Sequence, residues 1–218
     1  MKLSLNVVLA ASLIFLSSQA HALPLFDEDF ESGSLSQWVG KSTKGGTFDG
    51  VIVNDPVQSD NALTFTALNS AGDVFTKETF TSPSGLFKLS FDYLGLSAPT
   101  LVRVVPGDPD LGGFIGYSYG LPGGAVWLAG TQDNYPDPLF TYIADDGTWS
   151  SYEVFFSAVG PVHLIIEDFE GSGGVAGDAY FDNIRLESAP APIPEPTTML
   201  LLGTGLVGLA GLRRKFKK

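Results

Sequence analysis

Few side chains in this sequence could act as a nucleophile, a general base or a thiolate ligand. The chain has no cysteine and two histidines, His21 and His163, which excludes cysteine catalysis and thiolate metal sites. His163 is expected on the polar side of a strand, where a single histidine is usually solvated. The sequence has no Gly-x-Ser-x-Gly turn that would support a Ser-His-Asp triad through this histidine.

Carboxylates for glycoside hydrolysis are represented mainly by Glu167, Asp168 and Glu170. Glycosidases need two carboxyl groups about 5–9 Å apart on either side of the bond that breaks. Neighbouring residues of a strand point to opposite faces, so Glu167 and Asp168 do not form such a pair. We therefore expect no enzymatic activity, and the alternative is a secreted glycan-active enzyme of the lectin/glucanase sandwich class.

Aromatic residues gather in the glycine- and aspartate-rich stretch 106–138, which we expect to be irregular and displayed. Sugar rings stack their C–H faces on tyrosine and tryptophan, which bury a large area at low entropic cost. The candidate ligand-binding residues are Tyr117, Tyr119, Trp127 and Tyr135. The alternative is that Tyr117, Tyr119 and Trp127 lie on strands and simply pack.

The segment Asp178–Leu186 breaks the alternation of a regular strand. Phe181 and Ile184 are both bulky and apolar but stand three residues apart. A bulge at Asp182 and Asn183 would return both to the core. Because this break places a carboxylate near an acidic N-terminal strand, it predicts an oxygen-rich metal site.

The chain that positions these residues has the pattern of an all-β domain. Short runs rich in Val, Ile, Phe, Tyr and Thr alternate with Gly, Pro, Asp and Ser, which is typical of sandwiches and barrels. Period-2 alternation is clearest in Leu86–Leu94, Trp149–Phe156 and Val162–Asp168. Further strands are expected at Ala62–Leu68, Asp73–Phe80, Leu101–Val105, Gly124–Leu128 and Asp178–Leu186. The predicted fold is an antiparallel β-sandwich.

The ends of this region resemble carbohydrate-binding-module jelly rolls, the galactose-binding-like sandwiches. Phe26–Gly33, followed by Trp38, is similar to their opening, and Gly177–Leu186 is similar to their closing strand. The resemblance implies an all-β jelly-roll β-sandwich whose first and last strands lie side by side.

The same resemblance implies a structural Ca²⁺ ion. Its expected ligands are the side chains of Glu31 and Asp182, with Asp29 as a weaker candidate and backbone oxygens near Ser32 completing the shell. Calcium takes six to eight oxygen ligands, which such a set can supply. The alternative is that these carboxylates are solvated residues or turn caps.

Charge is unevenly distributed along the chain, which carries a formal net charge of −12. The stretch Leu23–Ser188 has 23 acidic and 6 basic residues, whereas the last six residues include five bases and no acid. An acidic body repels phosphates, which argues against a nucleic-acid partner. It is compatible with Ca²⁺ or with neutral partners such as sugars.

The N-terminus has the three parts of a secretory signal peptide over residues 1–22. Lys2 is followed by the apolar run Leu3–Leu16, and Ala20 and Ala22 supply small residues at the recognition positions. Cleavage is expected after Ala22. The alternative, a retained anchor, would need a longer apolar run than this one.

The sandwich domain is predicted over residues 23–188 and is followed by a proline-rich linker, residues 189–196. Proline at every second position predicts an extended, semi-rigid spacer. Thr197–Leu212 is apolar and, as a helix, would span about 24 Å, so we expect a transmembrane helix. The basic segment 213–218 is then a cytoplasmic tail under the positive-inside rule.

The tail begins with Pro194, Glu195 and Pro196, continues with a predicted Leu/Gly helix and ends in bases that include Arg213 and Arg214. This order of features resembles the PEP-CTERM sorting signal. The same tail is also called an ice-binding-protein C-terminal domain, a name that describes the tail alone. The resemblance implies passage through the secretion translocon and processing by an exosortase, a membrane transpeptidase of bacteria that make exopolysaccharide. A plain single-pass anchor with a proline-rich stalk is the alternative.

These features together predict an exported protein that is first anchored in the inner membrane and then reaches the cell surface or extracellular matrix. Its sandwich is expected to be a non-catalytic module for polysaccharide binding or adhesion, with exopolysaccharide as a candidate partner.

Overall fold

The computed structural model describes residues 23–40, 50–66, 74–96, 112–121, 124–131, 137–168 and 177–189. Within these ranges the chain forms strands and no helix. The strands are β1 (Leu23–Glu28), β2 (Trp38–Gly40), β3 (Gly50–Asn54), β4 (Asn61–Phe65), β5 (Val74–Thr76), β6 (Leu86–Gly95), β7 (Gly113–Ser118), β8 (Ala125–Gly130), β9 (Thr141–Tyr142), β10 (Ser150–Ser157), β11 (His163–Asp168) and β12 (Ala179–Ser188). The predicted strand Leu101–Val105, the signal peptide and everything after residue 189 lie outside the described residues.

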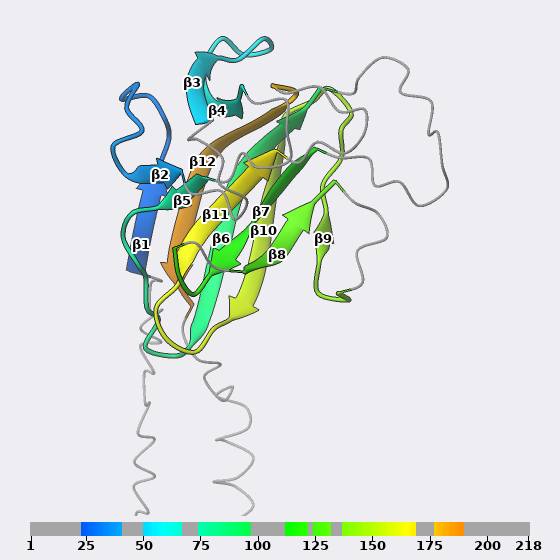
Figure 1. Cartoon of the computed structure of the whole chain (residues 1–218). Coiled ribbons are helices and arrows are strands. Elements are labelled where there is room, and N and C mark those ends of the chain that lie inside the picture. The colour runs from blue at the N-terminus through cyan, green and yellow to red at the C-terminus, as the bar shows by residue number, and fades with distance from the viewer. Residues whose placement is uncertain are drawn as a thin grey trace, which may run out of the picture.

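Two six-stranded sheets pack face to face (Figure 1). Sheet A has the order β10-β6-β12-β4-β3, with β1 also paired to β12, and sheet B has the order β2-β5-β11-β7-β8-β9. The neighbours are antiparallel, except for the parallel pair β8 and β9. The predicted all-β jelly-roll sandwich is confirmed. The first and last strands do lie side by side, since β1 pairs with β12 from Leu23 opposite Ser188 to Glu28 opposite Ile184.

Sheet A follows the period-2 pattern of its sequence. Along β6, Phe87, Leu89, Phe91 and Tyr93 are buried and the residues between them face outward. Inward rings from adjacent strands stack across the sheet, as Phe87 does on Phe156 with ring centroids 4.9 Å apart. Such cross-strand aromatic pairs stabilise the sheet beyond the area they bury.

The outer face of sheet A carries a row of ion pairs that crosses four strands. We call this row the charged ladder: Glu153, Lys88, Glu187, Arg185 and Asp27. Lys88 Nζ lies 2.6 Å from a Glu153 oxygen and 3.9 Å from Glu187. Arg185 Nε lies 2.9 Å from Glu187, and its Nη1 lies 3.5 Å from Asp27. The ladder keeps this face solvated.

The predicted bulge in the last strand is confirmed. The ladder between β12 and β6 shifts by one residue between Asp182 and Arg185. Asn183 takes a positive φ of 47°, a conformation that asparagine tolerates better than most residues. Phe181 and Ile184 are both fully buried as a result.

Sheet B departs from the predicted pattern, because β7 and β11 are buried on both faces. His163 was expected on the polar side of its strand, but it is buried, as is Glu167. His163 Nδ1 donates to the carbonyl of Thr76 at 2.7 Å, since a carbonyl only accepts. The reason for the difference is a second apolar layer on the outer face, where Ile165 pairs with Phe75 and both are buried.

Candidate functional site

Aromatic side chains from β7, β8, β9 and the residue that precedes β9 lie together on the outer face of sheet B. We call this set the aromatic face: Phe114, Trp127, Phe140 and Tyr142. Trp127 pairs with Gly116 on β7, one step along the outer face from Phe114. Tyr142 pairs with Gly130, which is itself opposite Phe114. Side chains of paired residues share a face, so the register brings these rings to one side of the sheet.

The rings of the aromatic face support one another. Phe114 is buried, and its centroid lies 5.5 Å from that of Trp127 and 6.2 Å from that of Phe140. Trp127 and Phe140 are half-buried, and Tyr142 is 52% exposed. The buried phenyl ring therefore acts as a support that holds more accessible rings in fixed positions. Rigid aromatic rings of this kind bury ligand area with little loss of side-chain entropy.

Two glycines make room for this arrangement. A Cβ at Gly130 would stand 2.4 Å from the Phe114 ring, and a Cβ at Gly116 would stand 2.2 Å from the backbone oxygen of Val126. Neither approach is tolerated without a shift of the ring or of the strand. The glycines therefore set how closely the rings approach the sheet and how closely β7 approaches β8.

The structure separates the aromatic residues that the sequence had grouped. Tyr117 lies on β7 but on the core side, where it is 7% exposed and stacks on Phe156 at 4.8 Å. Its ring offers no open face to a ligand, because β7 turns alternate residues to opposite sides. Tyr119 is 55% exposed and packs edge-on against Tyr117, away from Trp127. Tyr135 lies outside the described residues.

Phe140 and Tyr142 were missed by the sequence analysis. They stand two residues apart around Thr141, which is the spacing of side chains on one face of a strand. That short alternation was the available signal, but β9 has only two residues.

A group of carboxylates gathers at the end of sheet A where β1 finishes. We call it the acidic site: Glu31, Asp60 and Asp182. Glu31 follows β1 and accepts a hydrogen bond from the backbone N–H of Asn61 at 2.9 Å. Asp182 lies on the neighbouring strand β12, directly opposite Asp92 on β6. Residues from the two ends of the domain thus lie close enough for the charge of Glu31 to act on Asp182.

Local backbone conformation aims Glu31 outward. Phe30 has a positive φ of 55°, which is uncommon for a bulky residue, and its side chain is fully buried and stacked on Trp38. Glu28 Oε1 accepts a hydrogen bond from the Phe30 N–H at 3.1 Å. Strained residues persist only where their surroundings hold them, and here the core anchors Phe30.

The pKa values of two carboxyls in the acidic site are raised, by burial and by neighbouring negative charges. Burial raises the pKa of Asp182 to about 7, and the charges of Asp60, Asp92 and Glu31 add to this against a hydrogen bond from Asn183. For Glu31 the largest influence is the Asn61 N–H, which lowers the pKa. A hydrogen bond shared with Asp60, some desolvation and the charges of Asp60 and Asp29 outweigh it, so the pKa of Glu31 is raised.

The chemistry of the acidic site fits a hard divalent cation. All three side chains offer carboxylate oxygens, the ligands that calcium prefers. Within the described ranges, however, no three acidic or histidine side chains are grouped closely enough to hold a metal by themselves. Backbone oxygens would have to complete a calcium shell, which calcium accepts. Asp29 accepts a hydrogen bond from the Glu31 N–H at 3.1 Å and borders the site.

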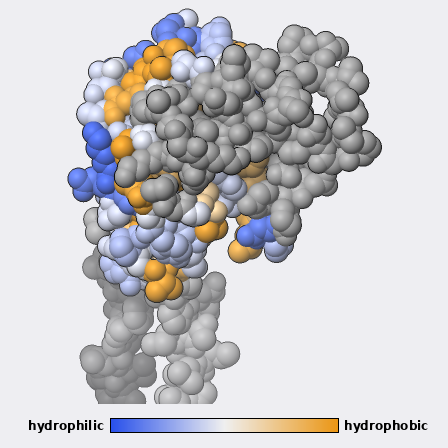
Figure 2. Space-filling view, in the orientation of Figure 1, coloured by the Kyte–Doolittle hydropathy of each residue, from blue (hydrophilic) through white to orange (hydrophobic). Residues whose placement is uncertain are grey.

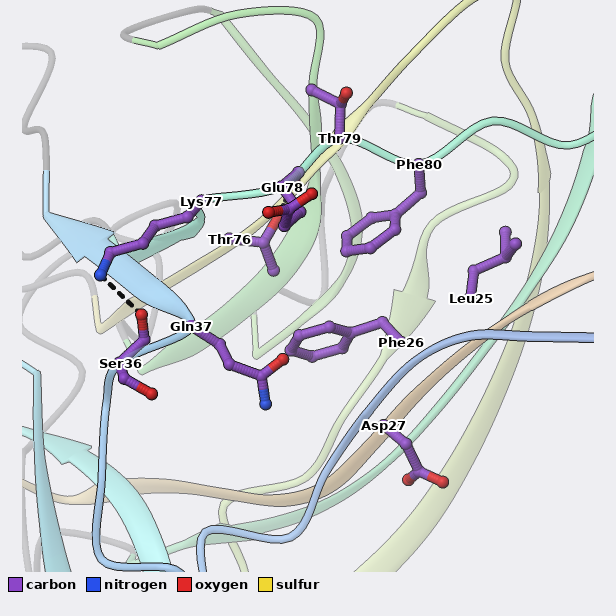
Figure 3. Close-up of a pocket in the computed structure, with 10 residues that line it drawn as sticks. All are labelled: Leu25, Phe26, Asp27, Ser36, Gln37, Thr76, Lys77, Glu78, Thr79 and Phe80. Atoms are coloured by element: carbon purple, nitrogen blue, oxygen red, sulfur yellow. Dashed lines mark hydrogen bonds between the residues drawn. The ribbon is translucent and has the colours of Figure 1, made fainter.

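A separate pocket of about 590 Å³ opens at the side of the sandwich, between β1 and the segment after β5 (Figure 3). Phe26 and Phe80 form its apolar wall, with ring centroids 5.4 Å apart. The polar rim includes Asp27, Lys77 and Glu78. Asp27 and Glu78 lie on opposite sides of the two phenyl rings and do not point toward each other (Figure 3). The pocket therefore lacks the facing carboxylates of a glycosidase.

The other acidic pair also fails to converge. Glu167 is opposite Phe114 on the outer face of sheet B, whereas Asp168 is opposite Gly113 on the core side. The predicted divergence of Glu167 and Asp168 is confirmed.

The C-terminal tail carries a recognised sorting signal. Residues 192–215 match the PEP-CTERM protein-sorting motif. The motif implies export, delivery to the cell surface and processing by an exosortase. No helix among the described ranges is long and apolar enough to cross a membrane. The predicted spanning segment 197–212, the sorting residues and the cleavage-site alanines lie outside those ranges.

The sandwich is similar in fold to solved structures of distant sequence, although no curated protein matches the chain. A cleaved adhesin domain of Lys-gingipain from Porphyromonas gingivalis W83 is 15% identical over 76% of this chain and 98% of that domain, with a TM-score of 0.51. A cyclase from Fischerella sp. TAU is 18% identical over 79% of this chain and 100% of its own, with a TM-score of 0.50.

A carbohydrate-binding module is also among the neighbours. The CBM22-1 xylan-binding domain of Paenibacillus barcinonensis Xyn10C is 13% identical over 78% of this chain and 97% of its own, with a TM-score of 0.46. An adhesin and a cyclase on one fold show that the sandwich does not by itself define an activity.

Proposed function

We propose that this protein is an exported surface or matrix protein whose sandwich binds polysaccharide through the aromatic face. The observation that carries the proposal is the set of partly exposed rings, Trp127, Phe140 and Tyr142, braced by the buried ring of Phe114. Pyranose rings present flat C–H faces that stack on such rings. An extended row across adjacent strands suits a chain of sugars better than a single small molecule.

A polysaccharide array tests the binding proposal. The mature protein is incubated with bacterial exopolysaccharides and with neutral and acidic glycans, with Ca²⁺ and with EDTA. Retention on one glycan class, reproduced by calorimetry, is the expected result. Failure to bind any of them, with a folded protein confirmed by circular dichroism, would contradict the proposal and favour a purely structural role.

The sorting motif sets where this module works. In our proposal the precursor is held in the inner membrane by residues 197–212, and exosortase then releases the body to the surface or matrix. Intact-mass measurement of surface-extracted protein should find a start at Leu23 and no basic tail. In cells without exosortase, protease added to spheroplasts should digest the anchored body. A mature protein that keeps Arg213 to Lys218, or a body protected until lysis, would contradict this route.

We propose in addition that a structural calcium ion binds at the acidic site. It would join Glu31, after the first strand, to Asp182 on the last strand and neutralise the repulsion that, together with burial, raises the pKa of Asp182. Its role would be to hold the end of the sandwich together. The glycan-active enzyme remains the alternative, and it would require two carboxylates that converge on a bound sugar.

A further inference from the structure

Both ends of the described domain leave the sandwich at the same place. Leu23 at the start of β1 is opposite Ser188 at the end of β12, at the bottom of Figure 1. The exit of β12 is tied down by hydrogen bonds. Ser84 Oγ donates to the Ala189 carbonyl at 2.6 Å, and the Ala189 N–H donates to the Leu86 carbonyl at 3.0 Å. We call this region the exit end.

Three turns form the rest of the exit end. The strand register places them there, because Leu86 is opposite Ser157, Phe80 bridges to Val162, and Ser118 is opposite His163. The turn residues described are 81–85, 158–161, 119–121 and 124. None of them is charged, although residues 23–188 include 23 acids. Figure 2 shows pale and orange shades at the lower left of the molecule, with strong blue at its lower right.

The opposite end of the sandwich has the reverse character. It carries Glu31, Asp60 and Asp182 of the acidic site, together with Asp29 and the exposed Asp146. Acidic residues do occur near the exit end, where Glu187 precedes Ser188 and pairs with Lys88, and where the charge of Asp137 acts on Tyr117. The turns themselves carry no charge, so they are the part of the sandwich that a negatively charged surface repels least.

The exit end also exposes side chains that suit a lipid interface. Val159, at the tip of the β10–β11 turn, is 93% exposed. Tyr119 is 55% exposed and stands edge-on against Tyr117, which is anchored in the core by Phe156. Tyrosine is enriched at membrane–water interfaces, where the ring is buried in the headgroup layer and the hydroxyl stays wet.

The tether is too short to let this end move far from the bilayer. Seven residues, 190–196, separate Ala189 from the predicted spanning segment 197–212. Even fully extended, they reach at most about 25 Å. The exit end is therefore the part of the sandwich that must face the membrane while the tail is inserted.

We propose that the exit end rests on the bilayer surface in the membrane-anchored precursor, through Val159 and Tyr119. This inference depends on the anchored precursor proposed above. Anionic lipid repels this end less than the acidic end, because the turns themselves bring no acid to the surface, and the exposed side chains of Val159 and Tyr119 supply the contact. The consequence is that the Pro194-Glu195-Pro196 motif is held beside the membrane, where a membrane transpeptidase can reach it.

Site-specific fluorescence on the full chain tests the docking. Because the chain has no cysteine, Val159→Cys and Tyr119→Cys each provide one labelling site, and Gln58→Cys in the exposed β3–β4 turn is the control at the other end. Each is labelled with an environment-sensitive fluorophore and reconstituted in phosphatidylethanolamine–phosphatidylglycerol vesicles. Positions 159 and 119 should show blue-shifted emission that brominated lipid quenches, and position 58 should show neither.

A charge change sharpens the test. In the Tyr119→Cys protein, Val159→Glu should reduce the ratio of docked to undocked molecules about fivefold, as expected for one charge at an anionic surface. Gln58→Glu is the matched control and should leave the quenching unchanged.

Vesicle flotation distinguishes failure of the docking from failure of the anchored precursor. A protein that does not float contradicts the anchored precursor, whereas one that floats with equal, unquenched signals at 159 and 58 overturns the docking. Signals at 159 and 119 that rise with protein density but are not quenched by brominated lipid would indicate contact between copies, and would also overturn it.

Discussion

The two sheets of this sandwich are both built from paired strands, but their outer faces differ in chemical character. The outer face of sheet A bears the charged ladder, in which Lys88 and Arg185 each contact two carboxylates. The outer face of sheet B bears the aromatic face and, beside it, the buried side chains of Phe75 and Ile165. An exposed phenylalanine, Phe155, lies among the charges of sheet A, and a buried one, Phe114, lies under the rings of sheet B.

This comparison shows that residue type alone does not identify a binding face. Phe155 is 63% exposed opposite Lys88, and no ring of the described residues stacks on it to orient a sugar. Phe114 is hidden but orients Trp127 and Phe140. A ligand platform requires rings that are both accessible and held in place, and sheet B provides this combination.

The largest expected difference between the two faces is in stability. Phe114→Ala removes a buried ring and leaves a cavity, so we expect a loss of about 3–5 kcal/mol in the free energy of unfolding. Phe155→Ala changes an exposed side chain and should alter it by no more than about 0.5 kcal/mol. Urea denaturation of both variants measures the difference. Equal losses would mean that the outer face of sheet B is no more ordered than that of sheet A.

The acidic end of sheet A should respond to calcium. At a hundredfold excess over its dissociation constant, a bound ion stabilises the native state by about 2.7 kcal/mol. EDTA should therefore lower the melting temperature by several degrees, and Ca²⁺ should restore it. The double variant Glu31→Gln with Asp182→Asn should lose this response.

The charged ladder offers a matched control for the calcium experiment. Asp27→Asn with Glu153→Gln also removes two carboxylates from the same outer face, but both belong to ion pairs. This variant should keep the full calcium response. A wild-type melting curve that EDTA does not move, with no heat of Ca²⁺ binding, would leave these carboxylates as acidic surface.

Ligand affinity should depend on one face only. Trp127→Ala removes the largest ring system of the aromatic face. The free energy of glycan binding should weaken by about 2 kcal/mol, or roughly thirtyfold in affinity. Phe155→Ala should leave the affinity unchanged. Calorimetry with the glycan retained on the array measures both. If the sheet A variant weakened binding more than the sheet B variant, the glycan would have to bind on the charged face.

In the absence of metal, the stability of the folded protein should depend on pH through the acidic site. The pKa of Asp182 is raised to about 7 in the folded protein, so between its ordinary value near 3.8 and 7 the native state binds more protons than the unfolded state. Protonation of Asp182 therefore stabilises the folded protein fully below about pH 4, and this stabilisation is lost as the pH rises through 7. In EDTA, Asp182→Asn should flatten that part of the pH–stability curve, as followed by thermal melts. A wild-type curve as flat as that of the variant would contradict a buried, repelled carboxyl.

The smallest effect is expected from the charged ladder itself. Lys88→Met keeps the aliphatic stem but removes the charge, and Lys88 is partly exposed, so the loss should be about 1 kcal/mol or less. Most of it should disappear at high salt, which screens such pairs. Denaturation in low and high salt measures this change. A large, salt-independent loss would mean that the ladder supports the fold as strongly as the buried rings do.

Much of the architecture was predictable from local sequence. The alternation in Leu86–Leu94 matches β6, and the spacing of Phe181 and Ile184 predicted the bulge that the register confirms. The sorting motif was also visible, because its proline, apolar and basic parts follow one another directly in the chain. These features depend on neighbouring residues, which are what a sequence displays.

The faces of sheet B were decided by tertiary structure. Alternation shows that a strand has two sides, but it does not show whether the outer side is covered. His163 and Glu167 are buried because the outer face carries its own apolar layer, and Tyr117 is in the core because β7 is a strand rather than a displayed loop.

The two sites depend on contacts between distant segments. Phe114 meets Phe140 through the pairing of β7, β8 and β9, and Glu31 meets Asp182 through the pairing of the first and last strands. Local sequence determined which residues form strands and where the chain is sorted. Only the long-range register decided which rings and carboxylates share a surface, because hydrogen bonds between distant strands set that register.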